Sequence, residues 1–442
     1  MQPLPPNEAI DAKASLLAAV GTLTFRDWTG DRDPCSIGTN VGCPALPCQR
    51  WRNFKEAFTP EFVANAIQET TGPVRHLADP FGGSGTAGLA AQFLGVRPTL
   101  IEVNPYLADL IEAKLTQYDI DEVRDCYAWL VDRVFTAKSP RTPSFAGAPK
   151  TFIEPGVDGR YVFSKEVARR IVVYRQVIDQ LSSPSIRRLF RVILGNIVVA
   201  VSNVVISGKG RRYRRDWAAR VPQPDTLDGL FRSSTEITVY DIHRYSARPS
   251  REYTVIRGDS RTLLQSIDEI DLAVFSPPYP NSFDYTDVYN VELWSLGYLD
   301  GPDANLALRK ATVRSHVQIA YDVNGTPYPS RRLQNAITKL TNVRQTLWNR
   351  RIPEMVSAYF SDMGNVLSAL ASKLRPKGRI YIVVGDSRYA GVQIPVAKVL
   401  VDFAPHVGLS VQRTEPCRSM RVSPQQGGQP GLPETLLVFE KP

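Results

Sequence analysis

Two short motifs, far apart in the chain, carry residue types that can do chemistry. The first is the glycine-rich stretch Asp79-Pro80-Phe81-Gly82-Gly83-Ser84-Gly85-Thr86, between a strand-like apolar run at 74–78 and a helix-like run at 87–94. Glycines let the backbone of such a loop approach a ligand closely, and the free N–H groups of the helix start face that ligand. This pattern predicts a loop that binds a nucleotide-like ligand.

An acid follows this loop at the end of the next strand-like run. Residues 98–101 are apolar and lead into Glu102, a carboxylate placed to accept hydrogen bonds from ribose hydroxyls. The loop lacks the G-x-G-x-x-G spacing and carries Asp-Pro-Phe, which disfavours a dinucleotide fold. A tight strand-to-helix turn without a ligand is the alternative interpretation.

The second motif is Ser276-Pro277-Pro278-Tyr279, at the end of the strand-like run 271–275. Open α/β sheets bind ligands at the carboxyl ends of their strands, and two prolines fix the backbone and remove two N–H donors. The resulting edge of carbonyl oxygens and one hydroxyl suits a planar group that bears an NH₂, such as a nucleobase or a carboxamide. Accepting the amino protons makes that nitrogen more nucleophilic toward a methyl sulfonium, without a metal or a covalent intermediate. The Tyr279 ring would stack on a base that has left its helix; a proline-rich turn is the alternative.

Taken together, the two motifs resemble those of the S-adenosylmethionine-dependent amino-methyltransferases of DNA. A serine before Pro-Pro-Tyr is similar to the cytosine-N4 enzymes, whereas adenine-N6 enzymes more often carry aspartate there. The resemblance implies S-adenosyl-L-methionine as cofactor and methyl transfer to N4 of cytosine in a specific duplex DNA sequence, in restriction-modification or phage defence. Adenine N6 in DNA, an RNA amino group and, more distantly, a protein glutamine are alternatives, and a non-catalytic nucleic-acid-binding subunit is an alternative of a different class.

The resemblance also implies roles for individual residues. The residues that would hold the target base are Ser276, Pro277, Pro278 and Tyr279. The residues that would hold the cofactor are Asp79, Pro80, Phe81, Gly82, Gly83, Ser84, Gly85, Thr86, Glu102, Asn104, Asp259, Ser260, Phe58 and Thr59. Among these, Asp259 would lie near the adenine of the cofactor, and residues 54–59 would contribute to its methionine end.

The elements that must position these residues indicate an α/β protein. We expect a seven-stranded, mostly parallel, Rossmann-like methyltransferase sheet with a largely helical insert. Residues 51–115 and 251–442 would form the methyltransferase domain, 1–50 an irregular N-terminal segment, and 116–250 the insert, which together with 300–352 is a candidate for DNA recognition. The glycine loop precedes the Ser-Pro-Pro-Tyr motif, whereas many cytosine-N4 enzymes have the opposite order.

Hydrophobic periodicity predicts the remaining elements. Helices are expected at 58–69, 106–115, 164–181, 185–206, 284–296 and 353–374, and strands at 253–259, 379–386, 409–413 and 435–440. Thr59 would cap the first of these helices, ahead of a proline in its first turn. Residues 139–155 resemble a linker, and residues 300–352 are expected to be irregular and basic.

The charge of the chain points to an anionic partner. The 442 residues carry a net charge of +9 and the pI is near 9.3, a balance typical of nucleic-acid-binding proteins. Residues 208–220 are basic and contain Tyr213 and Trp217, a composition suited to phosphate contacts with aromatic stacking. The predicted DNA-binding residues are Lys209, Arg211, Arg212, Arg214 and Arg215, and the four arginines would contact phosphates more than base edges. A solvated basic turn is the alternative.

The cysteines suggest a reducing compartment. Five cysteines without a recognisable secretion signal are typical of reduced thiols in a cytoplasmic protein. Cys35, Cys43 and Cys48 cluster, but a zinc or iron–sulfur site would need a fourth ligand such as Cys126 or Cys417, and no C-x-x-C pair is present. We therefore expect buried or free thiols and no metal.

The partner expectations follow from the same features. The longest apolar run, 189–206, is interrupted by polar residues and is typical of a buried helix rather than a membrane span. We expect duplex DNA as the partner and no membrane. A restriction endonuclease or other defence-system proteins are further candidate partners.

Overall fold

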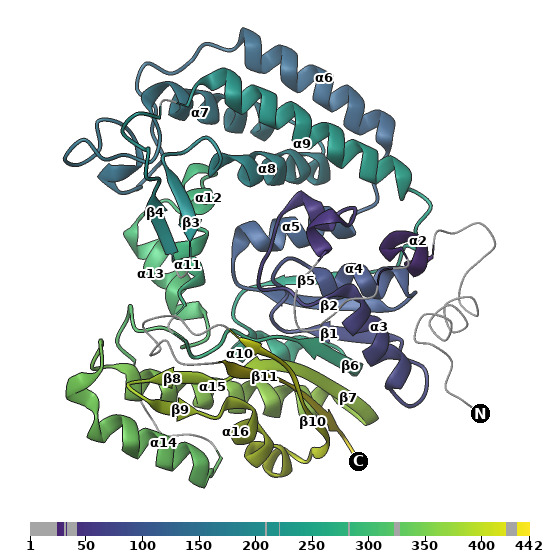
Figure 1. Cartoon of the computed structure of the whole chain (residues 1–442). Helices are drawn as coiled ribbons and strands as arrows, with labels where there is room; N and C mark the ends of the chain where they lie inside the picture. Colours follow the sequence, from purple (N-terminus) through teal and green to yellow (C-terminus); the bar gives the residue numbers. More distant parts are fainter. Residues whose placement is uncertain are drawn as a thin grey trace.

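The computed structural model describes residues 24–30, 32, 42–207, 210–220, 222–281, 283–321, 328–420 and 431–442. One large sheet lies at the centre, with helices on both of its faces, and the insert adds a further layer of helices beyond one of these faces (Figure 1). Among the described residues, no helix has the length and apolar character needed to cross a bilayer.

In the described part of the chain, seven strands form the central sheet in the order β10-β11-β7-β6-β1-β2-β5. The strands are β1 (His76–Asp79), β2 (Arg97–Glu102), β5 (Thr254–Arg257), β6 (Ile270–Phe275), β7 (Leu374–Gly385), β10 (Ser410–Met420) and β11 (Leu432–Glu440). Strands β5, β2, β1, β6 and β7 are parallel, whereas β11 is antiparallel to both β7 and β10. The expected seven-stranded, mostly parallel sheet is confirmed.

The strand order reverses beside β1. From β1 the chain continues outward on one side to β2 and β5, and it then returns to place β6 on the other side of β1. The register pairs Ala78 with Ala273, so the loops that follow β1 and β6 leave the sheet next to each other. Such a reversal point is where open α/β sheets bind ligands.

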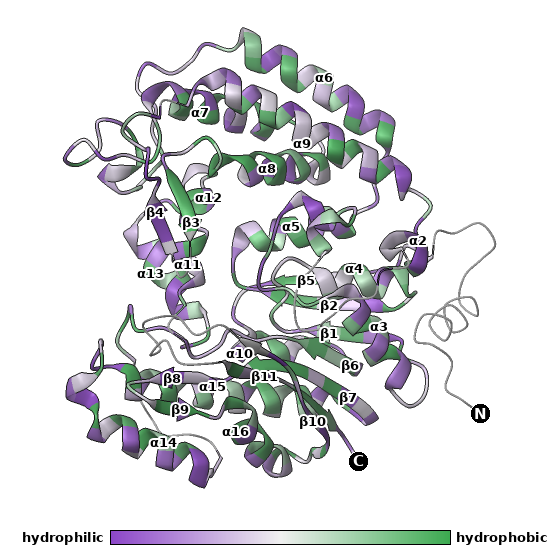
Figure 2. Ribbon diagram, viewed as in Figure 1, coloured by the Kyte–Doolittle hydropathy of each residue, from purple (hydrophilic) through white to green (hydrophobic). Residues whose placement is uncertain are grey.

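Alternating side chains of the strands fill two separate cores, because successive residues of a strand point to opposite faces. In β6, Leu272 and Val274 pack with the helices of one face, and Ala273 and Phe275 pack with those of the other. The first face is covered by α3 (Pro60–Glu69), α4 (Thr86–Phe93) and α5 (Pro105–Leu115), and the second by α10 (Ser260–Leu263), α15 (Ile352–Lys373) and α16 (Val396–Phe403). Burial on both faces explains why these strands are almost continuously apolar (Figure 2).

The insert is a layer of helices that extends the first core. Its elements are α6 (Ile120–Thr136), α7 (Lys165–Asp179), α8 (Pro184–Val198), α9 (Pro224–Arg244) and the hairpin of β3 (Val204–Ser207) and β4 (Gly210–Tyr213). Helix α8 packs against α5, and buried side chains such as Leu189 and Phe231 belong to the same hydrophobic cluster as Leu110 of α5. The insert therefore shares its core with the sheet domain.

Three expectations about elements were wrong in part. The helix expected to reach residue 206 ends at Val198, because Val204–Ser207 pairs with β4 instead. The helix expected at 284–296 is broken at Tyr289 into α11 (Tyr285–Val288) and α12 (Asn290–Ser295).

The third error concerns residues 300–352, which are not wholly irregular. They contain α13 (Pro302–Ala311) and α14 (Arg331–Asn342). Helix α14 buries Leu333, Ala336 and Leu340 along one narrow stripe, and its remaining surface is polar.

The smaller elements are α2 (Phe25–Thr29), β8 (Ser387–Tyr389), β9 (Val392–Ile394) and the 3-10 helices Cys43–Ala45, Gln49–Trp51, Lys150–Phe152, Leu264–Ser266, Arg344–Thr346 and Ala404–Val407.

Candidate active site

A cavity of about 330 Å³ opens at the carboxyl ends of β1 and β6, where the two motifs meet. The predicted residues that line it are Phe58, Asp79, Pro80, Phe81, Gly82, Gly83, Ser84, Thr86, Glu102, Asn104, Asp259, Ser260, Ser276, Pro277, Pro278 and Tyr279. Gly85 and Thr59 are not among the described residues that line it. Folding thus joins the glycine loop and the Ser-Pro-Pro-Tyr motif in one cleft.

The glycine loop needs its glycines for packing and for backbone conformation. Gly85 has φ +80° and immediately precedes α4, a left-handed conformation that residues with a Cβ rarely adopt. A Cβ on Gly82 would lie 2.8 Å from Cδ1 of Ile111 on α5. Gly85 therefore shapes the loop from behind and does not face the cavity.

Glu102, at the end of β2, holds the glycine loop through its carboxylate. Its Oε2 accepts from the backbone N–H of Gly83 at 2.7 Å, and its Oε1 accepts from that of Asn104 at 2.8 Å. Burial raises the pKa of Glu102 to about 7, and the two backbone hydrogen bonds oppose that rise. The carboxylate stabilises the loop, and its contact with a ribose stays a prediction.

Two further polar groups of this half of the cleft are buried. Burial raises the pKa of Asp79 to about 8, although its Oδ1 accepts from the backbone N–H of Phe81 at 2.9 Å. Asn104 caps α5 through Oδ1, which accepts from the N–H groups of Tyr106 and Leu107, while its buried Nδ2 has no hydrogen-bond partner among the described residues. The cleft therefore offers a donor that a ligand can engage.

Asp259 and Ser260 line the cleft, with their side chains already bonded. The carboxylate of Asp259 accepts from Nε and Nη2 of Arg261, at 2.9 and 2.6 Å, and from the backbone N–H of the same arginine. The hydroxyl of Ser260 donates to the carbonyl oxygen of Pro80. These bonds fix the turn after β5 against the glycine loop.

Lys114 of α5 was not predicted as a site residue, and it supports the glycine loop from the side of the protein interior. It is fully buried, and its Nζ donates to the carbonyl of Ser84 at 2.7 Å and to Oε1 of Gln49 at 3.0 Å. Gln49 in turn donates through Nε2 to Oγ1 of Thr86 at 3.3 Å. Burial lowers the pKa of Lys114 to about 7. The sequence signal that could have revealed this role is that Lys114 is the one lysine of helix α5, which is mostly buried.

The Ser-Pro-Pro-Tyr motif is anchored to the far side of the sheet. Oγ of Ser276 donates to the carbonyl of Val383 on β7 at 3.0 Å and lies 3.2 Å from the hydroxyl of Tyr279. That hydroxyl donates to Oε1 of Glu434 on β11 at 2.8 Å, and Arg418 of β10 forms an ion pair with the same glutamate. Burial and the adjacent carboxylate raise the pKa of Tyr279 well above its usual range, so the phenol keeps its proton.

Glu434 and Arg418 line the cavity and were not predicted. Glu434 is only 2% exposed and lies in β11 just before an apolar run at 436–439, and this position was the available sequence signal. Both residues lie on the antiparallel pair β10–β11. They come close to the Ser-Pro-Pro-Tyr motif because β11 pairs with β7, the strand next to β6.

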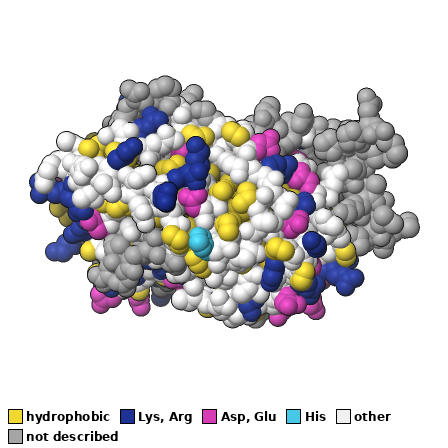
Figure 3. Space-filling model, turned by 90° about the horizontal axis from the view of Figure 1, so that it is seen from below, with side chains coloured by type: hydrophobic (Ala, Val, Ile, Leu, Met, Phe, Trp, Pro, Cys, Tyr) yellow, Lys and Arg dark blue, Asp and Glu magenta, His cyan; other side chains and the backbone are white. Residues whose placement is uncertain are grey.

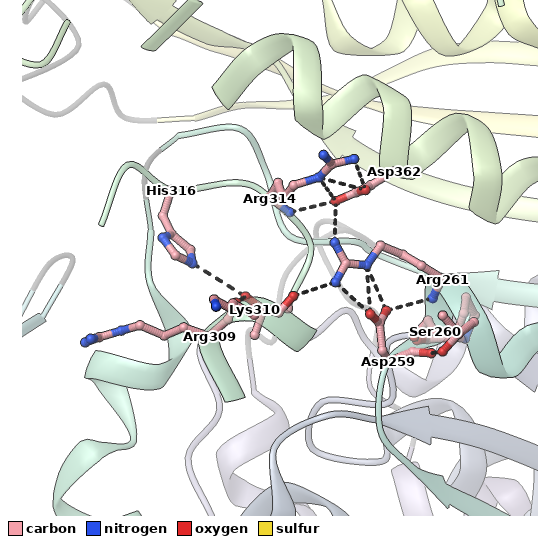
Figure 4. Close-up of polar contacts among 11 residues, drawn as sticks. Asp259, Ser260, Arg261, Arg309, Lys310, Arg314, His316 and Asp362 are labelled. Atoms are coloured by element: carbon pink, nitrogen blue, oxygen red, sulfur yellow. Dashed lines mark hydrogen bonds and ion pairs between the residues drawn. The ribbon is translucent and has the colours of Figure 1, made fainter. Parts of the chain in front are cut away.

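A second unpredicted wall comes from α13 and the segment after it. Leu308, Thr312 and His316 line the cavity there. The imidazole of His316 is 1% exposed, and a ring nitrogen lies 3.5 Å from Oγ1 of Thr312 (Figure 4). Burial lowers the pKa of His316, which favours the neutral imidazole.

Thr59 does not take the two roles predicted for it. It precedes α3, but its side chain makes no capping hydrogen bond. It is fully buried, and its Oγ1 has no partner among the residues that the structure describes. The wall on this side is formed instead by residues 54–58, with Phe58 among them as predicted.

The basic segment of the insert divides into bonded and exposed arginines. Nη1 of Arg211 donates to Oδ1 of Asn290 at 3.1 Å, and Arg214 donates to the carbonyls of Ser202 and Val199. Arg212 and Arg215 are exposed, and Lys209 lies outside the described residues. Phosphate contacts by this segment stay a prediction.

Side chains on one face of the surface and the described cysteines could form further charged or metal-binding clusters. On the face shown in Figure 3, described basic side chains are scattered among acidic and apolar ones. Cys43 and Cys48 are buried free thiols, Cys126 and Cys417 are also free, and Cys35 lies outside the described residues. Within the described ranges, no group of three or more His, Cys, Asp or Glu side chains is arranged to hold a metal.

The chain is similar to curated methyltransferases along most of its length. It is 23% identical over 436 residues to the Type II methyltransferase M.AvaI of Nostoc sp. (strain PCC 7120 / SAG 25.82 / UTEX 2576), a match that covers 90% of this chain and 87% of that protein. The Type II methyltransferase M.BsoBI of Geobacillus stearothermophilus is 22% identical, with 89% and 85% covered. No protein-family model matches the chain.

Solved structures with a likeness to the chain also include methyltransferases. TrmN from Thermus thermophilus has a TM-score of 0.28 at 10% identity, and the match covers 87% of this chain and 49% of the TrmN chain. The rRNA methyltransferase aviRa from Streptomyces viridochromogenes has a TM-score of 0.29 at 10% identity, with 99% and 94% covered. Superpositions this loose do not support a function for this chain.

Proposed function

We propose that this protein is an S-adenosylmethionine-dependent DNA methyltransferase that modifies N4 of cytosine within a specific duplex sequence. One observation carries the proposal: a methyltransferase-type sheet brings the glycine loop and Ser276-Pro277-Pro278-Tyr279 to a single cleft at its reversal point. Similarity to Type II methyltransferases over about nine-tenths of the chain supports the same class.

The residues of the glycine-loop half fit the cofactor. Buried Asn104 Nδ2 offers an unused donor, Glu102 lies at the end of β2 where a ribose would bind, and Gly82 and Gly83 line the cavity. Bound S-adenosylmethionine would supply an electrophilic methyl group on sulfur. Asp79 would keep a proton on Oδ2 at neutral pH, because its pKa is about 8 and Oδ1 already accepts from Phe81.

The other half fits an amino group on a flat ring. The hydroxyl of Ser276 donates to Val383, so its oxygen lone pairs can accept an amino proton from the base. Tyr279 has its hydroxyl fixed by Glu434, which leaves the ring as a rigid surface for stacking. These residues orient the nitrogen toward the methyl group and hold its protons. Bound S-adenosylmethionine would supply the methyl group to this nitrogen and would leave as S-adenosylhomocysteine, and the displaced amino proton would pass to solvent.

The choice of cytosine rests on Ser276, and adenine N6 is the second candidate because the same edge can accept from either base. A restriction endonuclease or another defence-system protein stays a predicted partner, and cytoplasmic location stays a prediction.

The test is direct. The purified protein is incubated with S-adenosylmethionine labelled in the methyl group and with unmethylated plasmid DNA, and the nucleosides are identified by mass spectrometry. We expect N4-methylcytosine. N6-methyladenine as the sole product would overturn the cytosine assignment, and label in an RNA substrate alone would overturn the DNA assignment. A protein that binds the cofactor and labels neither would be the non-catalytic subunit.

A further inference from the structure

Asp362 of α15 is a buried carboxylate that two arginines share. It is 1% exposed, and its Oδ2 accepts from Nη1 of Arg261 at 3.0 Å. Nη2 of Arg314 donates to Oδ1 at 2.6 Å, and the backbone N–H of Arg314 donates to Oδ2 at 2.9 Å (Figure 4). The two arginines come from separate segments, and each of these segments forms part of the cleft.

Arg261 contacts the turn after β5, which belongs to the half of the cleft proposed to bind the cofactor. Its Nε and Nη2 hold the carboxylate of Asp259, which lines the cleft after β5, and its Nη2 also donates to the carbonyl of Lys310 at 2.6 Å. One guanidinium therefore joins the turn after β5, helix α15 and the end of α13. A shift of Asp259 on cofactor binding would act on this guanidinium, because the two groups share a two-point ion pair.

Arg314 belongs to the opposite wall, in the segment 312–316. Thr312, Val313, Ser315 and His316 of this segment line the cavity, and Arg314 alone points away from it to Asp362. The segment follows α13, whose Arg309 donates through Nε to Asp284 at 2.8 Å. Asp284 follows the Ser-Pro-Pro-Tyr loop, so α13 and the segment connect the acceptor side with the cofactor side.

The charges of this cluster balance only when Asp362 is ionised. Asp259 and Asp362 face Arg261 and Arg314, two negative groups against two positive ones. Removing the charge of Asp362 would leave two guanidiniums beside a neutral buried group, and loss of one partner of a buried ion pair strongly disfavours the paired arrangement. Segment 312–316 would then lose its main attachment to α15.

We infer that Asp362 is a positioning residue that couples the cofactor turn at Asp259 to the acceptor wall formed by segment 312–316. The inference rests on the proposed function in that it takes the two halves of the cleft as cofactor and acceptor sites. The coupling is reciprocal, so that cofactor binding orders the wall and a DNA base against the wall favours cofactor binding.

The test measures amide hydrogen exchange of the full chain with and without S-adenosylhomocysteine. In the wild type we expect the cofactor product to slow exchange in peptides that cover 312–316 by about fivefold or more. In Asp362→Asn this protection should be lost, although S-adenosylhomocysteine still binds. Arg314→Gln cuts only the wall side and should lose the protection as well, whereas Arg314→Lys keeps the charge and should restore part of it.

The matched control is Asp228→Asn. Asp228 of α9 is held by Nε and Nη2 of Arg170 and by the hydroxyl of Tyr174, a comparable cluster within the insert. This variant should retain the wild-type protection of 312–316, so that a general loss of stability is separated from loss of coupling.

The outcomes separate the coupling from the proposed function. Absence of protection in the wild type, or equal protection in the wild type and in the Asp362→Asn and Arg314→Gln variants, would overturn the coupling. If Asp362→Asn does not fold, the result with Arg314→Gln decides. A wild type that methylates no DNA but shows protection that these variants lack would overturn the DNA assignment and leave the coupling in place.

Discussion

The two halves of the cleft are assembled in different ways. The half proposed to bind the cofactor, here called the cofactor half, comes mainly from consecutive segments between β1 and α5, where the glycine loop, Glu102 and Lys114 lie close together in the sequence. The acceptor half combines Ser276-Pro277-Pro278-Tyr279 with Glu434 of β11 and the segment 312–316, which are far apart in the chain. Local backbone geometry defines the first half, and long-range side-chain bonds define the second.

The comparison predicts that acceptor-half substitutions affect turnover and spare cofactor binding. Replacing Tyr279 with Ala removes the ring and should lower kcat by roughly a hundredfold, because a misplaced reacting group costs about that much. The Kd of S-adenosylhomocysteine, measured by calorimetry, should stay within about threefold of the wild-type value, since the proposed cofactor contacts lie in the glycine-loop half. Tyr279→Phe keeps the ring but loses the hydrogen bond to Glu434, so its kcat should lie between those of the wild type and of Tyr279→Ala. A collapse of cofactor affinity in Tyr279→Ala would contradict this division.

The converse substitution lies in the cofactor half. Gly85→Ala places a Cβ at φ +80°, 3.2 Å from Cγ1 of Ile111, and should lower the free energy of unfolding by about 1–2 kcal/mol. The displaced loop should raise the Kd of S-adenosylhomocysteine by about tenfold, which corresponds to about 1.4 kcal/mol.

Gly408→Ala is the matched control for Gly85→Ala. It has φ +74° with no atom within 4 Å of the added Cβ, so it brings similar backbone strain without a loop contact. Chemical denaturation and calorimetry should show destabilisation by both variants and weaker cofactor binding only for Gly85→Ala. Equal cofactor affinity for the two variants would mean that the loop tolerates the added Cβ.

A pH titration tests the buried acid of the cofactor half. The pKa of Asp79 rises from 3.8 to about 8 on folding, so the folded chain binds the proton more tightly and this contribution to stability is lost as the pH rises from about 4 to 8. Asp79→Asn stays neutral and should flatten that part of the stability curve, as measured by denaturation at several pH values. An unchanged slope would show that Asp79 is ionised in the folded protein.

The smallest effect is expected in the insert, outside both halves. Changing Arg212 and Arg215 together to Ala should weaken DNA binding severalfold and reduce the slope of log K against log salt by about 2. Changing Arg211 and Arg214 should instead reduce stability and leave the salt slope nearly unchanged, because both side chains bond within the protein. Fluorescence anisotropy at several salt concentrations measures the DNA affinity and the salt slope of each double variant, and chemical denaturation measures its stability. If Arg212 and Arg215 can be replaced without a change in the wild-type salt slope, the segment is a solvated turn.

The same contrast explains what the sequence revealed. The loop, Glu102 and Ser276 were predictable because glycines, prolines and a strand-end acid are local signals, and the apolar runs of β1 and β6 identify a doubly covered sheet. Helix α13 was missed because none of its residues is fully buried, and only Ala304 and Leu308 pack, partly buried, against the core. Glu434 joins the site through the pairing of β11 with β7, which depends on the complete sheet. Thr59 was misplaced because the turn before α3 directs its side chain into the interior.

Strand β11 has a consequence for the order in which the site is completed during synthesis. It inserts between β7 and β10, both of which precede it in the chain, and it supplies the carboxylate that holds Tyr279. A chain emerging from the ribosome can therefore form the glycine loop and its supports while the tyrosine still lacks its anchor. The glycine-loop half of the cleft would therefore be complete before the Ser-Pro-Pro-Tyr half, which has to wait for the pairing of β11 with β7.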